Sequence, residues 1–222
     1  MQTENRANIK DINFDHGELE LEFERDDEIK WRSSFGEIIS VHFFPIPPDL
    51  PAPVHDLSIH RESARVRLAE ISGAVIEVEI AQLGDYAALH QIFKLPMKPS
   101  GMLYIASYTI PFQTCSFVIK AQCPEVGATG IRDALVADMS EVDLDELENN
   151  RIVIIEGGKK IPWMQDPYEP NFEAPLLRNR SEDRQWDAEF PDHPLSRARK
   201  FLEKVKDSFS AAASLRVLPP FA

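Results

Sequence analysis

Apolar and polar residues alternate along much of the first half of the chain. In "ELELEF" (18–23), Leu19, Leu21 and Phe23 alternate with three glutamates. A period of two is typical of a β-strand that has one face buried and one face in water. The same period predicts strands at 37–44, 64–70 and 73–82. The last two are expected to pair as a hairpin around "ISG".

A further hairpin is predicted where "MLYIASYTI" (102–110) and "CSFVIKAQC" (115–123) flank the loop "PFQT". Pairing Ile110 with Cys115 places apolar or aromatic residues opposite each other on one face and more polar residues on the other. A slip of one residue would turn every side chain to the opposite face, so the pattern argues for this pairing. We therefore expect Cys115 and Cys123 on the core face.

These two cysteines are expected to be free thiols. Eight strand positions at about 3.3 Å each separate them by roughly 26 Å, whereas a disulfide needs Cα atoms within about 7 Å. A buried cysteine behaves as a small hydrophobic residue. A reactive cysteine needs a nearby cation or helix N-terminus, and the helix expected to begin near Thr129 keeps a nucleophilic Cys123 open as an alternative.

Helices are predicted near 85–94, 129–139 and 195–213. Each range has apolar residues three or four positions apart, which is the spacing of one helical face. In the second range these positions are Ile131, Leu135 and Met139. Pro194 suits the first turn of the last helix, because the N–H that proline lacks would have no partner there.

Together these elements predict an α+β fold, in which about three helices cover a twisted, mainly antiparallel sheet of six or seven strands, much as in an α/β/α sandwich. We expect residues 1–222 to form a single domain, because a chain with 43% hydrophobic residues can bury one sizeable core. Within it, 162–192 is predicted to be a long irregular segment that wraps the core, and 195–213 to be a C-terminal amphipathic helix.

The composition limits the classes of partner and compartment. A formal net charge of −13 argues against nucleic acid, because such binding depends on cationic side chains that displace counterions. No apolar run is long enough for a membrane-spanning helix, and the N-terminus lacks the pattern of a secretion signal. The basic side of the last helix leaves a membrane surface as an alternative to packing on an acidic core. Two cysteines fit a reducing compartment, so we expect a cytoplasmic protein.

The segment 162–192 is rich in aromatic residues that disordered linkers usually lack. They are Trp163, Tyr168, Phe172, Trp186 and Phe190. We expect this segment to be ordered and its aromatic residues to bind another protein. A further interpretation is a homo-oligomer in which the segment covers the neighbouring subunit.

"WDAEFPDHPLSR" offers the best candidate for catalysis, because a carboxylate of Asp187 or Asp192 could orient the imidazole of His193. The structural interpretation is that Asp192 or His193 caps the last helix. His55 and His60 lack a third ligand at a familiar distance. No compact catalytic signature is present elsewhere, and we expect no metal and no cofactor.

The order of elements resembles the PsbP and DcrB group of α/β/α sandwiches. The likeness lies in the antiparallel sheet, the hairpin that leads into "TGIRDALV" and the closing helix "SRARKFLEKVKDSF", and it covers about 18–139 and 195–213. It implies a non-catalytic adaptor, chaperone or accessory subunit. The long insertion at 162–192 departs from the group, and no motif allows a family site to be carried over.

The favoured function is therefore a non-catalytic, soluble interaction protein, either an adaptor or chaperone-like, whose partner is another protein. The alternative is a small hydrolase-like enzyme that uses Asp187, Asp192 and His193.

Overall fold

The computed structural model describes residues 7–143 and 152–221. Residues 1–6, 144–151 and 222, which the expected single domain includes, lie outside this description. The helices are α1 (Leu57–Glu70), α2 (Ile131–Met139) and α4 (Pro194–Ser208), and the short 3-10 helices are η1 (Ile9–Asp11), η2 (Arg180–Glu182), η3 (Arg184–Trp186) and η4 (Ala213–Val217). The strands are β1 (Ile12–Asn13), β2 (Glu20–Glu24), β3 (Glu28–Arg32), β4 (Ile38–Phe44), β5 (Ala74–Leu83), β6 (Tyr86–Pro96), β7 (Met102–Pro111), β8 (Ser116–Pro124), β9 (Glu141–Val142), β10 (Val153–Glu156), β11 (Lys159–Pro162) and β12 (Ser210–Ala211).

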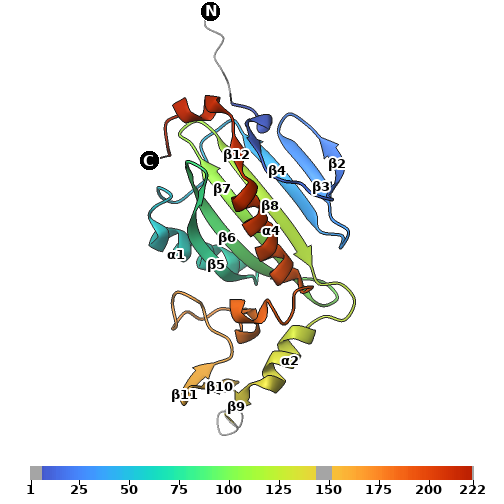
Figure 1. Ribbon diagram of the computed structural model, residues 1–222. Coiled ribbons are helices and arrows are strands. Elements are labelled where there is room, and N and C mark those ends of the chain that lie inside the picture. The colour runs from blue at the N-terminus through green and yellow to red at the C-terminus, as the bar shows by residue number, and fades with distance from the viewer. Residues whose placement is uncertain (1–6, 144–151, 222) are drawn as a thin grey trace, which may run out of the picture.

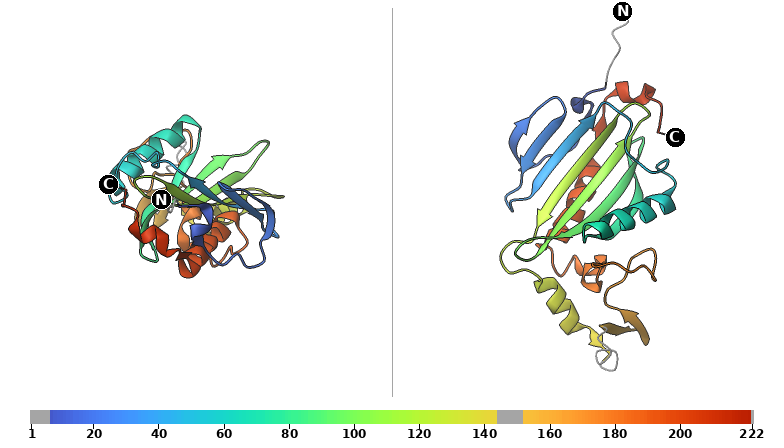
Figure 2. Two further views of the ribbon diagram at one scale, coloured as in Figure 1. Left: turned by 90° about the horizontal axis from the view of Figure 1, so that it is seen from above. Right: turned by 180° about the vertical axis from the view of Figure 1, so that it is seen from behind.

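Seven strands form one antiparallel sheet in the order β2-β3-β4-β8-β7-β6-β5. The chain crosses from β4 to β5 through α1, and it returns so that β8 pairs with β4. Figure 1 shows α4 lying across one face of this sheet. The views from above and from behind show the twist of the sheet and α1 on the opposite face (Figure 2). The predicted α+β sandwich is confirmed.

The helix α4 holds the larger core together. Leu195, Ala198, Leu202 and Val205 recur every three or four positions and are fully buried in this core. Pro194 is at the start, and the ring Nδ1 of His193 accepts a hydrogen bond from the Leu195 amide (3.2 Å), so His193 is the N-cap. The helix is shorter than predicted because the chain leaves it after Ser208 and forms β12, which pairs with β1.

The hairpin of β7 and β8 has the predicted faces, but its register differs by two residues. Ile110 pairs with Phe117 rather than with Cys115. The turn is tighter than expected because the Phe112 amide donates to the Cys115 carbonyl (2.9 Å). A shift of two keeps the same side chains on the core face. Cys115 and Cys123 are accordingly free and buried there, as predicted.

The predicted helix at 85–94 is wrong, because all of this range except Asp85 belongs to β6. Both faces of β6 are covered where α4 and α1 lie over the sheet, and Ala88, Leu89 and Ile92 are fully buried. A strand buried on both faces carries apolar residues at adjacent positions. Such a run can show the spacing of a helix by coincidence. Periodicity alone therefore cannot distinguish a short buried strand from a helix.

The predicted strand at 64–70 is also wrong, because this stretch is the second half of α1. Its buried side chains are His60, Ala64 and Leu68, four positions apart, while Val66 is exposed. The apparent alternation arose because Leu68 follows Ala64 by four positions, a spacing that suits a helix and a strand equally. The partner of 73–82 is therefore β6, not 64–70.

The remaining elements form a small unit that we call the end lobe, which consists of α2, β9, β10, β11, η2 and η3. It lies beyond one end of the large sheet (Figure 1). Its own core contains Val136, Ile154 and Trp163. The helix α2 was expected to cover the sheet, but instead it packs against η2 and β9.

Candidate functional site

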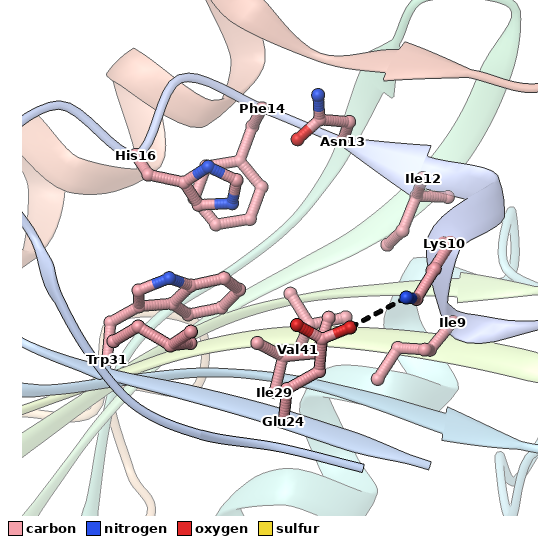
Figure 3. Close-up of a pocket in the computed structure, with 11 residues that line it drawn as sticks. Ile9, Lys10, Ile12, Asn13, Phe14, His16, Glu24, Ile29, Trp31 and Val41 are labelled. Atoms are coloured by element: carbon pink, nitrogen blue, oxygen red, sulfur yellow. Dashed lines mark ion pairs between the residues drawn. The ribbon is translucent and has the colours of Figure 1, made fainter. Parts of the chain in front are cut away.

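A pocket of about 430 Å³ lies between the N-terminal segment and the sheet strands β2, β3 and β4. Figure 3 shows Phe14 and His16 on the N-terminal segment facing Trp31 on the sheet below them. The lining residues are Ile9, Lys10, Ile12, Asn13, Phe14, His16, Leu21, Glu24, Ile29, Trp31 and Val41. Pockets of this size with mostly apolar walls are typical of binding sites for small groups.

Three rings form one wall of the pocket. His16 stacks on Trp31, with ring centroids 4.5 Å apart and an interplanar angle of 27°. Phe14 lies beside both, 4.6 Å from His16 and 5.9 Å from Trp31. Strand pairing positions the tryptophan, because Trp31 lies opposite Leu21 on one side and Ile39 on the other. The wall is therefore apolar and of defined orientation, and Phe14 and Trp31 present only their edges to the pocket, with 3% and 7% of their surface exposed.

The imidazole of His16 is suited to an apolar wall. Burial lowers the pKa of His16 below its ordinary value, with the nearby Asp15 carboxylate opposing this effect and Lys204 adding to it. The ring is therefore neutral at neutral pH, and its face can contact an apolar group without a charge between them.

An ion pair crosses the mouth of the pocket. Lys10 Nζ on η1 lies 2.8 Å from Glu24 Oε1 on β2, and their side chains are 73% and 41% exposed (Figure 3). Exposed ion pairs add little to stability, because water solvates both partners when they separate. The pair can open to admit a ligand at little cost.

The pocket opens beside β2, which is an edge strand of the sheet. Residues 18–28 include seven acidic residues and one arginine. Glu22 pairs with Lys30 and Arg32, and Glu24 pairs with Lys10. Within the described part of the chain, Glu18 and Glu20 make no ion pair. The outer side of β2 is thus an acidic strand edge.

The other edge strand, β5, is covered at Val78 by side chains of the protein itself. The Tyr168 hydroxyl accepts a hydrogen bond from the Val78 amide (2.7 Å), and Arg61 Nε donates to the Val78 carbonyl (3.1 Å). The Arg61 guanidinium also lies 3.8 Å from the centre of the Tyr168 ring. These side chains occupy the backbone groups with which a further strand would pair.

The structure places Asp187 and His193 near each other but joins both to Arg132. Asp187 Oδ1 accepts from Arg132 (3.1 Å), and it also accepts from Arg199 Nη1 (2.9 Å) and the Ser196 hydroxyl (2.9 Å). Nδ1 of the His193 ring lies 3.5 Å from Nη1 of Arg132. No hydrogen bond joins Asp187 to His193 among the described residues.

His193 and Asp192 have other neighbours. His193 Nε2 lies 3.5 Å from Glu125 Oε1, and its Nδ1 caps α4. Asp192 is exposed, and its backbone carbonyl accepts a hydrogen bond from Arg197. The carboxylate of Asp187 is thus engaged by two guanidinium groups, an arrangement that anchors the start of α4 to the end lobe.

The aromatic residues of 162–192 contact the rest of the chain at several places. Trp163 is buried in the core of the end lobe, and Trp186 and Phe190 are partly buried against the same core. Tyr168 packs under α1, and Phe172 lies 5.8 Å from the guanidinium of Arg65. These rings therefore contact the core of the end lobe, the region of α1 and Arg65, all within the protein.

The sequence did not indicate the pocket. Phe14, His16 and Trp31 come from segments that are separated in the chain, and no local pattern links them. The useful signal was the acidic alternation at 18–24, which marks a strand whose one side stays in water.

The described residues contain no group of three or more His, Cys, Asp or Glu residues placed to hold a metal ion. None of the helices in 7–143 or 152–221 is both long enough and apolar enough to cross a membrane.

The comparisons with known proteins give no family assignment. No protein-family model matches this sequence. A search of the curated proteins also gives no match.

Proposed function

We propose that this protein is a non-catalytic interaction protein of the adaptor type, which binds an extended, basic segment of another protein along β2. One apolar side chain of that segment enters the pocket formed by Phe14, His16 and Trp31. The observation that carries this proposal is the position of an apolar pocket directly beside an uncovered, acidic strand edge.

The geometry of strand addition connects the edge with the pocket. A segment that pairs with an edge strand gains main-chain hydrogen bonds, and its alternate side chains point to the same face of the sheet. Leu21 and Glu24 of β2 both line the pocket, because a bulge between Leu21 and Phe23 brings Glu24 to the same face as Leu21. Side chains of an added strand on that face would lie over the mouth between Lys10 and Glu24.

The charge of the edge selects the partner. Seven acids in residues 18–28 favour a segment rich in lysine or arginine. They also disfavour pairing between the β2 strands of two copies, because like charges would then lie opposite each other. The partner is therefore a different protein rather than a second copy of this chain.

Other features support the same proposal. The element order, with α1 between β4 and β5 and α4 after β8, suits the resemblance to the non-catalytic PsbP and DcrB group. Two buried free thiols suit a reducing compartment, so we place the protein in the cytoplasm.

The test uses short synthetic peptides in which lysine alternates with valine around one central phenylalanine. We expect such a peptide to bind and to shift the amide NMR signals of the pocket and of β2. A peptide with alanine for phenylalanine, or with glutamate for lysine, should bind at least about tenfold more weakly.

Two protein variants complete the test. Glu18→Lys/Glu20→Lys reverses charges that make no ion pair in the described structure, so it should weaken binding without loss of stability. Glu62→Lys on α1 reverses an exposed charge away from β2 and should bind normally. Equal binding of the lysine and glutamate peptides, or no binding by either, would show that the proposal is wrong.

A further inference from the structure

The helix α2 buries a different side from the one that its apolar stripe predicts. Its apolar stripe of Ile131, Leu135 and Met139 faces solvent, with exposures of 50%, 46% and 56%. The charged Arg132 is 1% exposed, and Val136 is also buried. A surface helix normally buries its apolar stripe and leaves its charges in water.

Arg132 holds the helix in this orientation. Its Nε donates to the Ser181 carbonyl (2.6 Å), and its Nη2 donates to the Asp183 carbonyl (3.1 Å). Its Nη1 donates to the Ser196 hydroxyl (2.8 Å) and to Asp187 Oδ1 (3.1 Å). A buried guanidinium is stable only when it is paired and hydrogen-bonded in this way. Rotating α2 to bury its stripe would break all of these bonds.

The stripe of Ile131, Leu135 and Met139 therefore stays exposed to solvent in the folded protein. The three side chains stand four positions apart and form one continuous row on the surface of α2. A sequence that departs from the usual pattern at one place commonly does so at a functional surface, and a continuous apolar patch commonly marks a site of contact.

The charge around the patch indicates what covers it. The exposed acidic residues Asp138 and Glu141 adjoin the stripe, and the whole chain has a net charge of −13. Pairing two copies through α2 would bring these like charges together. Self-association through α2 is therefore unfavourable, whereas a partner with basic flanks would be attracted.

We infer that α2 is a docking surface for an amphipathic helix of another protein, with leucine-like residues along one face and lysine or arginine on both flanks. Such a helix lays its apolar side chains between Ile131, Leu135 and Met139. Its cations lie beside Asp138 and Glu141. Binding of such cations would give the acidic residues beside the stripe a role in recognition.

This surface is separate from the strand edge proposed above. The helix α2 lies beyond the end of the sheet at which β8 finishes, whereas η1, which carries Lys10, lies toward the other end (Figure 1). The two surfaces can be occupied at the same time by two different proteins. Such an arrangement would let the molecule act as a bridge.

The probe is a synthetic amphipathic helical peptide with leucines on one face and lysines on the flanks, compared with the same peptide carrying glutamates on the flanks. We expect the lysine peptide to bind and to shift amide NMR signals of residues 131–141. Leu135→Ser/Met139→Ser should weaken binding at least about tenfold. Val66→Ser is the matched control, because it removes an equally exposed apolar side chain from α1.

Four results would overturn the inference. They are absence of binding by the lysine peptide, equal binding by the glutamate peptide, an equal loss in the Val66→Ser control, and a dimer in sedimentation that Leu135→Ser/Met139→Ser dissociates. Thermal unfolding checks that both variants are folded, and Ile131→Ser provides a second substitution in the stripe. Glu18→Lys/Glu20→Lys should leave this binding unchanged, so failure here is distinguishable from failure of the strand-edge proposal.

Discussion

Lys94 and Glu182 form an ion pair in the interior of the protein. Lys94 Nζ on β6 lies 2.8 Å from Glu182 Oε2 on η2, and the two side chains are only 2% and 1% exposed. The same carboxylate accepts from the Tyr104 hydroxyl (3.1 Å) and the Asn179 amide (2.8 Å). Burial, and then the charge of Glu182, raises the pKa of Tyr104 well above its ordinary value. The tyrosine therefore stays protonated and remains a donor.

We expect Lys94→Met to destabilise the protein strongly. It leaves the Glu182 carboxylate buried without its cation, and breaking a buried ion pair in this way costs about 3–5 kcal/mol. Lys94→Met/Glu182→Gln removes both charges and should lose less than Lys94→Met alone. Urea unfolding of the wild type, Lys94→Met, Glu182→Gln and the double variant gives four free energies. A double variant that loses the sum of the two single losses would contradict this coupling.

Arg132 should be required for the end lobe to hold together and to stay joined to α4. Arg132→Leu removes the donor that binds Ser181 and Asp183 within the lobe and Ser196 on α4, and we expect it to lower the free energy of unfolding by about 3–5 kcal/mol. Arg132→Lys keeps the charge but lacks the planar fork, so it should restore little. Hydrogen exchange would show faster opening of η2. Full stability of the lysine variant would mean that charge alone matters.

Both thiols should react slowly in the folded protein. Burial raises the pKa of the Cys115 thiol and that of the Cys123 thiol, and the thiolate is the reactive form. We expect iodoacetamide to label neither cysteine appreciably at mildly alkaline pH, and to label both after unfolding in concentrated urea. Mass spectrometry counts the labels. Prompt labelling of Cys123 in the native protein would instead support the nucleophile interpretation.

Stability should fall when the pH is lowered through the ordinary histidine range. Burial lowers the pKa of His16 and that of His42 in the folded protein. Below about pH 6.5 the unfolded chain therefore binds these protons more readily than the folded chain, and stability is lost as the pH falls. Urea unfolding between about pH 7.5 and pH 5.5 measures the slope. His16→Phe should make the slope smaller, and an unchanged slope would exclude a contribution from His16.

Tyr168 should protect the β5 edge. Tyr168→Phe removes the acceptor for the Val78 amide and should cost about 0.5–1.5 kcal/mol. It also leaves a strand edge more open to other chains, so we expect more aggregation on storage, measured by light scattering. The control is Phe172→Leu, which replaces another ring of the same segment, one that makes no hydrogen bond. This variant should not aggregate faster than the wild type.

Local patterns in the sequence predicted much of the sheet. The alternation at 102–110 and 115–123 identified the hairpin and its core face, although the register was wrong by two residues. The face could be predicted because side chains alternate strictly along a strand. The register could not, because it depends on the geometry of the turn at Phe112 and Cys115.

The candidate surfaces could be predicted only in part. The stripe Ile131, Leu135 and Met139 was visible as a helical face, but its exposure was not. The side of α2 that faces inward depends on the partners of Arg132, which come from η2, η3 and α4. No window of neighbouring residues contains that information.

The sequence by itself determined the α+β class, the core face of β7 and β8, the packed stripe of α4 and the acidic character of β2, because each follows from a period within one segment. Only the tertiary structure decided that 85–94 is a strand, that α2 presents its apolar face to solvent, and that Lys94 meets Glu182 across 88 positions of chain. These features depend on which distant segments cover a strand and which distant groups pair with a buried charge. Such contacts form only when the segments pack together.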